Sequence, residues 1–450
     1  MYKPYIKPVS TAKPHVRVPE PKISKFVLFV CRIFGRIYLF LVLGIAKIVV
    51  RGGEHIFRAY EKALSGKSRC IVAFRHPNGG EPQLLMWFIL FKLRNLARKA
   101  RFRFCKRPHV SFVYGYEVAR WGGRIARWIM PNLGAMPVHH TKIDSVGMGR
   151  IFKAISEGPY PLAIAPEGQV SYTTESVPRL EQGTVRIGFQ AAERISKEHK
   201  ECPVEILPVS IHFRYGKMGE WSLARLVKKI EKYTGLDGGK AGFTERLEKA
   251  RYHILEQNEK RYGITGGEEL SFNGRIDRII DKALETAEQL LGVGPRGRET
   301  INRIYHIRQL CWDRIIIPGK TSLKDMTLVE RALADLKAGE AWYAGRHMEL
   351  VDFIWYFRVP VPAETAPLHE KMEYAQNLWD FANRTMGGAY SNRVLNVHPK
   401  RVLIQIAPKI DLSARLAEYK NNKKKAVNKA MDDLVTAFQG CIHEAAEYRI

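Results

Sequence analysis

Cysteine is scarce in this chain of 450 residues, and the few cysteines lie far apart in the sequence. No two of them form a C-x-x-C pair, which argues against a disulfide framework. Scattered cysteines are typical of a protein from a reducing compartment. The six residues are Cys31, Cys70, Cys105, Cys202, Cys311 and Cys441.

Acidic residues are also few, with 45 Asp and Glu against 73 Lys and Arg, so the formal net charge is +28. A positive field of this size favours anionic partners: a phospholipid surface, a nucleic acid or an acidic carrier protein. The chain has no basic region with heptads, no zinc-finger spacing and no aromatic RNA-binding block, so we expect no nucleic-acid partner. Hydrophobic residues make up 46% of the chain, which argues against disorder. A length of 450 residues is enough for two domains.

Long hydrophobic runs are missing as well. Residues 26–50 are strongly apolar, but Arg32, Arg36 and Lys47 interrupt them, and the stretch 37–46 has only ten residues. A helix needs about 20 apolar residues to cross a bilayer. The apolar run begins late and lacks a small-residue cleavage site, so we expect no secretory signal peptide.

The same N-terminal region favours contact with a membrane surface. On one continuous helix Lys25, Arg32, Arg36 and Lys47 would share a narrow stripe, because they are spaced 7, 4 and 11 residues apart. A cationic stripe on an otherwise apolar helix is typical of a helix in the membrane interface, with its basic side chains at lipid phosphates. We therefore expect residues 1–60 to form a membrane-associating segment. A single membrane span with snorkelling ends and a buried core helix are the alternatives.

Residues 61–216 alternate strand-like and helix-like patterns. Strand patterns at 70–74, 111–114, 135–138, 162–165 and 204–212 are separated by helical patterns at 81–96, 144–157 and 181–197. Pro82 suits the first position of a helix, and Asp144 suits a helix cap. This alternation predicts an α/β domain with a largely parallel sheet flanked by helices.

Two short turns, about ninety residues apart, carry the polar groups that suggest chemistry. The first follows the apolar run 70–74 and holds His76 with Glu81 five positions on; the second follows the run 162–164 and holds Glu167 and Gly168. Turns after the strands of an α/β sheet are the usual place to expose reactive groups. A histidine with a nearby carboxylate is the pair that a general base and its orienting partner require.

These turns, with two further blocks, resemble the glycerophospholipid acyltransferases, the lysophosphatidic acid acyltransferase superfamily. The family's H-x4-D signature is similar to His76 and Glu81, with glutamate in place of aspartate and Arg75 where asparagine often precedes the histidine. Its E-G-T-R-S block resembles residues 167–171, its G-x-x-F-I-x-R block resembles residues 134–140, and its proline-centred strand resembles residues 204–211. The blocks occur in the family's order.

The resemblance also guides the domain prediction. In the family, a strand ending near G-x-P and a helix close the catalytic domain, and Ala407-Pro408 is similar to that ending. We therefore predict a catalytic domain made of residues 61–216 and 399–450, with residues 217–398 as a large helical insertion. Helical patterns at 244–262, 275–291, 298–312, 323–337 and 341–357 dominate the insertion. The alternative is an independent second domain that happens to end in a strand.

The resemblance implies roles for the residues of the two turns. His76 would take a proton from an acceptor hydroxyl, and Glu81 would orient its ring and stabilise the imidazolium. Glu167 and Gly168 stand where the family contacts its acceptor, and Ser171 either caps a segment or touches substrate. Adjacent histidines on a strand point to opposite faces, so His139 and His140 give no reason to expect a metal site.

One departure from the family concerns the acceptor's phosphate. The arginines that bind it in the second and third blocks are replaced here by His140 and Val170. Valine cannot bind phosphate, and histidine does so only weakly unless it is protonated. Lys142 and Arg179, with Arg150 and Arg186 close by in sequence, are the candidate substitutes; otherwise the acceptor carries no phosphate.

Together these residues imply a membrane-associated O-acyltransferase, peripheral or monotopic, with its catalytic domain on the cytoplasmic side. We expect an acyl-CoA or acyl carrier protein thioester as co-substrate, no bound cofactor and an anionic membrane surface as partner. The expected acceptor is 1-acyl-glycerol 3-phosphate. The alternatives are acylation of a non-phosphorylated lipid alcohol and a catalytically idle lipid-surface binding protein with the same fold.

Overall fold

The computed structural model describes residues 9–15, 18–116, 118–139, 144–198, 201–216, 218–295, 297, 299–320, 322–385 and 399–448. The chain divides into two compact units. The sheet unit comprises Val18–Met218 and Asn396–Ile450, and the helical unit comprises Met1–Arg17 and Gly219–Leu395.

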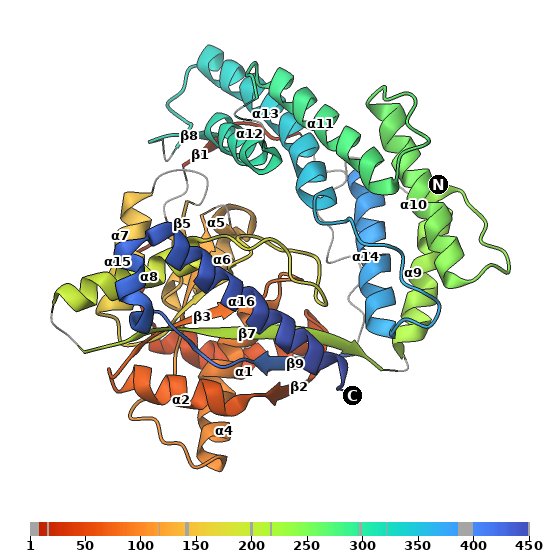
Figure 1. The fold of residues 1–450 in the computed structure, drawn as a ribbon. Coiled ribbons are helices and arrows are strands. Elements are labelled where there is room, and N and C mark those ends of the chain that lie inside the picture. The colour runs from red at the N-terminus through yellow and green to blue at the C-terminus, as the bar shows by residue number, and fades with distance from the viewer. Residues whose placement is uncertain are drawn as a thin grey trace. The chain divides into compact units, whose positions relative to one another are not determined.

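The sheet unit contains a mostly parallel sheet (Figure 1). Its strands, in spatial order, are β2 (Ile45–Arg51), β9 (Lys400–Ile406), β7 (Val204–Tyr215), β3 (Arg69–Phe74), β6 (Leu162–Ile164), β4 (Ser111–Gly115) and β5 (Met136–Val138). The short β10 (Ile410–Asp411) also pairs with β7. Neighbours are parallel except where β7 meets β9 and β10. The predicted α/β class with a largely parallel sheet flanked by helices is confirmed.

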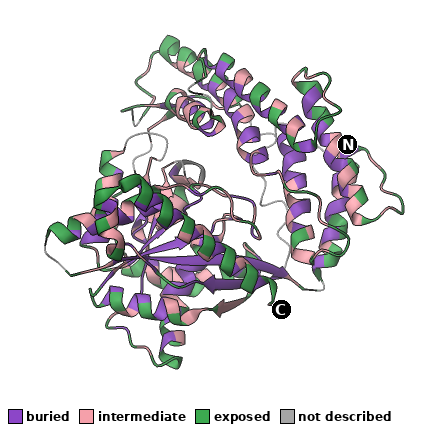
Figure 2. Cartoon of the chain, in the orientation of Figure 1, coloured by how far each residue is buried: buried purple, intermediate pink, exposed green. Residues whose placement is uncertain are grey.

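Helices cover both faces of this sheet, and strands such as β3 bury apolar side chains on both sides. In β3, Cys70, Val72 and Phe74 join one core, whereas Ile71 and Ala73 join the other. The first core is covered by α1 (Lys25–Leu41), α2 (Gly53–Leu64), α3 (Glu81–Phe88), the π-helix η1 (Ile89–Leu93) and α4 (Arg94–Lys99). The second is covered by α7 (Ser145–Ser156), α8 (Gly183–Lys197), α15 (Leu416–Asn421) and α16 (Lys423–Ala446). Buried strands with no polar face are the signature of such a three-layer arrangement, and Figure 2 shows the burial concentrated along the strands.

The predicted stripe of four basic residues on one helix is wrong at its C-terminal end. Helix α1 stops at Leu41, and Lys47 lies on the edge strand β2. Gly44 adopts φ +67°, a conformation that glycine tolerates, and the β-branched residues that follow favour a strand. Arg36 donates to the carbonyls of Ile45 and Ala46, so it ties the helix to the strand.

Among the described residues, no helix combines the length and apolarity that crossing a bilayer requires. Contact of the N-terminal helix with a membrane interface stays a prediction.

Two helices predicted in the sheet unit, at 144–157 and 81–96, are present, but their ends or continuity differ from the prediction. Asp144 caps α7 by accepting from the backbone N–H of Gly147 at 2.8 Å. The predicted helix 81–96 is instead three consecutive segments, α3, η1 and α4, because a π-helical stretch interrupts it. Two helices of the sheet unit, α5 (Val118–Trp121) and α6 (Gly123–Asn132), lie between β4 and β5 in the chain.

The helical unit consists of long helices and one small parallel sheet of β1 (Lys13–Pro14) and β8 (Ile316–Ile317). The helices are α9 (Met218–Thr234), α10 (Phe243–Arg261), α11 (Phe272–Leu290), α12 (Thr300–Ile315), α13 (Leu328–Ile354) and α14 (Leu368–Thr385). Helix α13 joins the two helices predicted at 323–337 and 341–357 into one. The assignment of residues 217–398 as an insertion into a catalytic domain stays a prediction.

Candidate active site

His76 and Glu81 form a hydrogen-bonded pair just beyond β3. The ring nitrogen Nδ1 of His76 lies 2.8 Å from Oε2 of Glu81. An ionised carboxylate only accepts hydrogen bonds, so Nδ1 carries the proton and Nε2 keeps its lone pair. The His76 side chain is partly exposed, whereas that of Glu81 is fully buried. The pair therefore has the form of a general base held by a buried carboxylate.

The turn between the two residues holds Glu81 in place. Its Oε1 accepts from the backbone N–H of Asn78 at 2.9 Å, and its Oε2 accepts from that of Gly79 at 2.8 Å. Gly79 has φ +94°, which a residue with a Cβ adopts only under strain. Glu81 also begins α3, where the helix dipole favours a negative charge. These contacts fix the carboxylate and aim it at the ring of His76.

Glu167, in the turn after β6, accepts hydrogen bonds from the backbone of His76 and from the side chain of Arg75. Its Oε2 accepts from the backbone N–H of His76 at 2.8 Å, and its Oε1 accepts from Nε of Arg75. Both side chains of the Arg75–Glu167 pair are 1% exposed. The strands β3 and β6 are parallel neighbours, so their carboxyl ends bring these two turns together. Glu167 thus contacts the protein on both oxygens, and a contact with an acceptor stays a prediction.

Gly168 and Ser171 lie in the same turn. Gly168 adopts φ +71°, and a Cβ there would lie 3.1 Å from Cγ of Glu181, so the turn requires glycine. Ser171 donates its backbone N–H to the carbonyl of His76 at 3.1 Å, and its side chain is buried. Tyr172 has φ +59°, unusual for a residue with a side chain, and such strain concentrates at functional sites. The two sequence-predicted turns are therefore physically joined.

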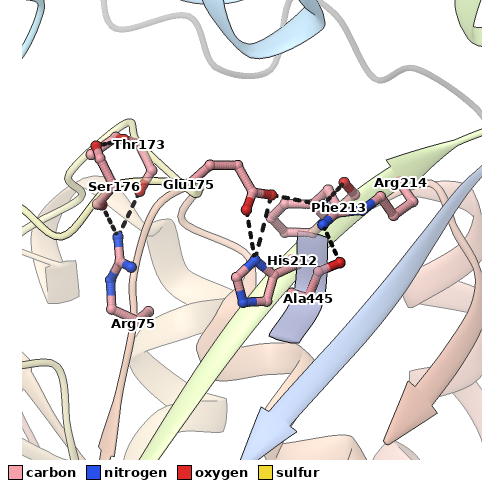
Figure 3. Close-up of polar contacts among 8 residues, drawn as sticks. All are labelled: Arg75, Thr173, Glu175, Ser176, His212, Phe213, Arg214 and Ala445. Atoms are coloured by element: carbon pink, nitrogen blue, oxygen red, sulfur yellow. Dashed lines mark hydrogen bonds and ion pairs between the residues drawn. The ribbon is translucent and has the colours of Figure 1, made fainter. Parts of the chain in front are cut away.

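Arg75 is a site residue to which the sequence analysis assigned no role. Its guanidinium donates to the carbonyls of Thr173 at 2.7 Å and Ser176 at 2.8 Å (Figure 3). It also donates to the carboxylate of Glu167. A single buried side chain therefore fastens the loop after Glu167 over the end of β3. The only sequence signal is that arginine stands where the family often has asparagine.

The same loop is fastened a second time by His212, which the sequence analysis also missed. Nδ1 of His212 lies 3.3 Å from Oε2 of Glu175, and Arg214 donates to Glu175 at 2.7 Å and to the Ala445 carbonyl at 2.9 Å (Figure 3). Burial lowers the pKa of His212, and the Glu175 carboxylate acts in the opposite direction. His212 directly follows the proline-centred strand block, which is the signal that could have found it.

A buried lysine lies within electrostatic range of Glu81. Burial lowers the pKa of Lys400 to about 8, and the charge of Glu81 acts to raise it. Lys400 begins β9, and its Nζ lies 5.1 Å from the ring centroid of Phe213.

The residues expected to bind the acceptor's phosphate are scattered. His140 and Lys142 lie outside the described residues. Arg179 is exposed on the segment before α8. Arg186 donates to the amide oxygen of Gln182 at 2.7 Å, and Arg150 forms an ion pair with Glu20. The contacts of the described candidates do not bring any of them to His76.

No metal-binding group emerges within the described ranges: they contain no cluster of three or more His, Cys, Asp and Glu side chains suited to an ion. His76 provides a base, Glu81 orients and stabilises it, and the Glu167–Arg75 pair fixes the backbone of the histidine. This arrangement suits proton removal from a hydroxyl or water.

In comparisons with known proteins, no family model matches the chain and no curated protein matches it. The likeness to the glycerophospholipid acyltransferases therefore rests on the four sequence blocks. Function has to be inferred from His76, Glu81 and the groups that hold them, because a fold alone does not determine activity.

Proposed function

We propose that this protein is an O-acyltransferase that moves a fatty acyl group from a thioester to a lipid hydroxyl. The observation that carries the proposal is the 2.8 Å contact between Nδ1 of His76 and Glu81, whose buried carboxylate is fixed by two backbone N–H groups. This geometry fits the H-x4-D signature that the sequence resembles. A histidine whose ring is oriented by a carboxylate has the form of a general base.

In the proposed reaction, Nε2 of His76 takes the proton of the acceptor hydroxyl while the hydroxyl oxygen attacks the thioester carbonyl. The carbon–oxygen bond forms, the tetrahedral intermediate collapses, and the carbon–sulfur bond breaks. The imidazolium then returns the proton to the departing thiolate, so the enzyme ends as it began. Glu81 stabilises the imidazolium throughout, and no covalent enzyme intermediate is needed.

The proposed acceptor is a lysophospholipid of the 1-acyl-glycerol 3-phosphate type, and the donor is an acyl-CoA or an acyl carrier protein thioester. Such an acceptor needs a cation at its phosphate. Among the residues that the structure describes, the candidate for this cation is Arg179, which is exposed on the loop that follows the Glu167 turn. A non-phosphorylated lipid alcohol is the second candidate, favoured by Val170 in the place of a family arginine.

We further propose that the sheet unit works at a membrane surface on the cytoplasmic side. Helix α1 exposes large apolar side chains, including Phe26 at 64%, Phe29 at 60% and Leu41 at 64%. The ring of Trp128 on α6 lies 6.4 Å from that of Phe26, and Ile125 beside it is 74% exposed. An apolar patch of this kind on an exposed surface is typical of an interaction site, and for a lipid-modifying enzyme a bilayer is the fitting partner.

A catalytically idle lipid-binding protein is the rival from another class. Such a protein has no need for a buried carboxylate with two backbone donors against a histidine ring. The desolvation of Glu81 costs free energy that only a functional or structural role would maintain. The contact of Glu81 with the His76 ring, which a structural role alone does not require, therefore favours the enzyme.

The proposal is tested by incubating the full chain with radiolabelled acyl-CoA or acyl carrier protein thioester and a panel of lipid acceptors. The panel includes 1-acyl-glycerol 3-phosphate, other lysophospholipids and long-chain alcohols. We expect product with a lysophospholipid and release of one thiol per ester formed. Absence of ester with every donor and acceptor pair, from protein shown to be folded, would contradict the enzyme assignment.

A further inference from the structure

A strongly basic segment of the sheet unit plays no part in the site described above. Residues 92–107 contain eight basic residues and no acidic residue. Among the ion pairs of the described residues, none joins one of these side chains to a carboxylate. Self-repulsion in such a segment is unfavourable unless an anion offsets it. The eight are Lys92, Arg94, Arg98, Lys99, Arg101, Arg103, Lys106 and Arg107.

Part of this segment lines a shallow groove along η1 and α4. The groove has a volume of about 630 Å³, and its lining includes Lys92, Asn95, Arg98 and Lys99 with one apolar residue, Leu96. The three basic side chains are exposed, and Arg98 donates to the amide oxygen of Asn95 at 2.9 Å. Several ammonium and guanidinium donors around one groove are suited to phosphate oxygens.

The groove lies close to helix α1, through the indole of Trp87. Trp87 of α3 lies against Gly35 of α1 so closely that a Cβ on the glycine would be 2.7 Å from the indole. On the same ring, Nζ of Lys92 lies 5.4 Å from the centroid and the guanidinium of Arg36 lies 5.9 Å from it. One indole therefore connects the basic groove to the helix that exposes Phe29 and Phe34.

We propose that this groove is a binding site for the phosphate headgroups of anionic lipids, used while the apolar face of α1 enters the bilayer surface. The inference rests on the membrane association proposed above and adds the lipid class and the residues that select it. A basic groove next to an apolar helix face matches the layered chemistry of a bilayer, with phosphates beside acyl chains. An acidic soluble protein would satisfy the charges but would leave the aromatic face of α1 in water.

The test is sedimentation of the full chain with vesicles, which needs no turnover. One set of vesicles is phosphatidylcholine alone, and the other contains 30% phosphatidylglycerol. The groove variant is Lys92→Ala/Arg98→Ala/Lys99→Ala. The matched control is Lys423→Ala/Lys424→Ala/Lys425→Ala, which removes the same charge from exposed positions on α16, on the opposite face of the sheet.

We expect the groove variant to bind the anionic vesicles about a hundredfold more weakly than wild type, since each basic residue at an anionic surface contributes about fivefold. Binding to neutral vesicles should not change, and the control should stay within threefold of wild type on both. The excess binding of wild type to anionic vesicles should also fall steeply between 0.1 and about 1 M salt.

Three outcomes would overturn the proposal, and they have different meanings. Equal losses in the groove and control variants would show that net charge acts without a site. Unchanged vesicle binding by the groove variant, with a higher KM for an acyl carrier protein donor, would make the groove a protein-docking site. Binding of wild type to neither vesicle would refute the proposed membrane association itself, while acyl transfer to detergent-dispersed acceptor would still report on the chemistry of His76.

Discussion

Replacing Arg75 with methionine should release the loop that covers the end of β3. The guanidinium and the Glu167 carboxylate form a pair in which each side chain is 1% exposed, and the guanidinium also holds two carbonyls of the loop. After the change, Glu167 keeps only the N–H of His76 among these contacts, so a buried carboxylate loses its cation. Removing one partner of a buried ion pair typically costs about 3–5 kcal/mol.

The backbone amide of Ser171 is the natural probe, because it donates to the carbonyl of His76 at 3.1 Å and belongs to this loop. Hydrogen exchange followed by mass spectrometry should show its protection falling by about two to three and a half decades, at about 1.4 kcal/mol per decade. Arg69→Met is the control: it removes an arginine of the same strand that donates to the carbonyl of Gly158 at 2.7 Å, and about 1 kcal/mol is expected. Protection of Ser171 within threefold of wild type in Arg75→Met would refute the bracing role of the pair.

Four further outcomes follow. Glu81→Gln should lower kcat by about tenfold to a hundredfold, because the NH₂ group of glutamine would face a backbone N–H donor where a carboxylate oxygen accepted. The loss should be smaller than that caused by removing the base, and an unchanged kcat would remove Glu81 from the mechanism. Gly168→Ala should destabilise the protein by about 1–2 kcal/mol in urea unfolding, given φ +71° and the close Glu181 side chain, and a neutral effect would contradict the turn geometry. Burial lowers the pKa of His109 to about 4 from 6.5, so the folded state favours the neutral ring. The free energy of unfolding should therefore be unaffected by this group above pH 6.5 and fall by about 3 kcal/mol as the pH drops toward 4. This pH-dependent loss should be absent in His109→Gln. Phe29→Gln/Phe34→Gln should weaken binding to neutral and anionic vesicles alike, and a loss confined to anionic vesicles would contradict a hydrophobic contact.

The strands β3 and β6 were predictable because each is a short apolar run that ends in a glycine-bearing turn. The runs before His76 and Glu167 became β3 and β6, neighbouring parallel strands, so chain pattern alone brought both turns to one edge. The pairing of His76 with Glu81 was predictable too, since a five-residue separation across a turn into a helix leaves the two side chains in reach.

The bracing groups were not predictable, because they depend on contacts between distant parts of the chain. Nothing local indicates that Arg75 is buried with a carboxylate 92 positions away, or that His212 meets Glu175 from 37 positions away. The end of α1 was misjudged for a different reason. Apart from Lys47, residues 42–50 remain apolar like the helix before them, and only Gly44 and the β-branched residues after it signal the change from helix to strand.

The helical unit was correctly predicted to be mostly helical, but one long helix was predicted as two. The sequence analysis placed two helices at 323–337 and 341–357, whereas the single helix α13 continues from Leu328 to Ile354. Propensity and periodicity predict that a helix exists better than they predict where it ends, since caps and packing set the ends.

The central claim is that His76 is the base of an acyl transfer, and the most direct measurement compares His76→Ala with His443→Ala. The control removes an exposed histidine of the same unit that also lies near a glutamate, with Nε2 3.9 Å from Glu447. Rates of ester formation are measured with saturating acyl thioester and lysophospholipid, with circular dichroism to show that both variants are folded. We predict a fall of about 10²–10⁴-fold for His76→Ala and no change for His443→Ala. Activity of His76→Ala within twofold of wild type would contradict the account.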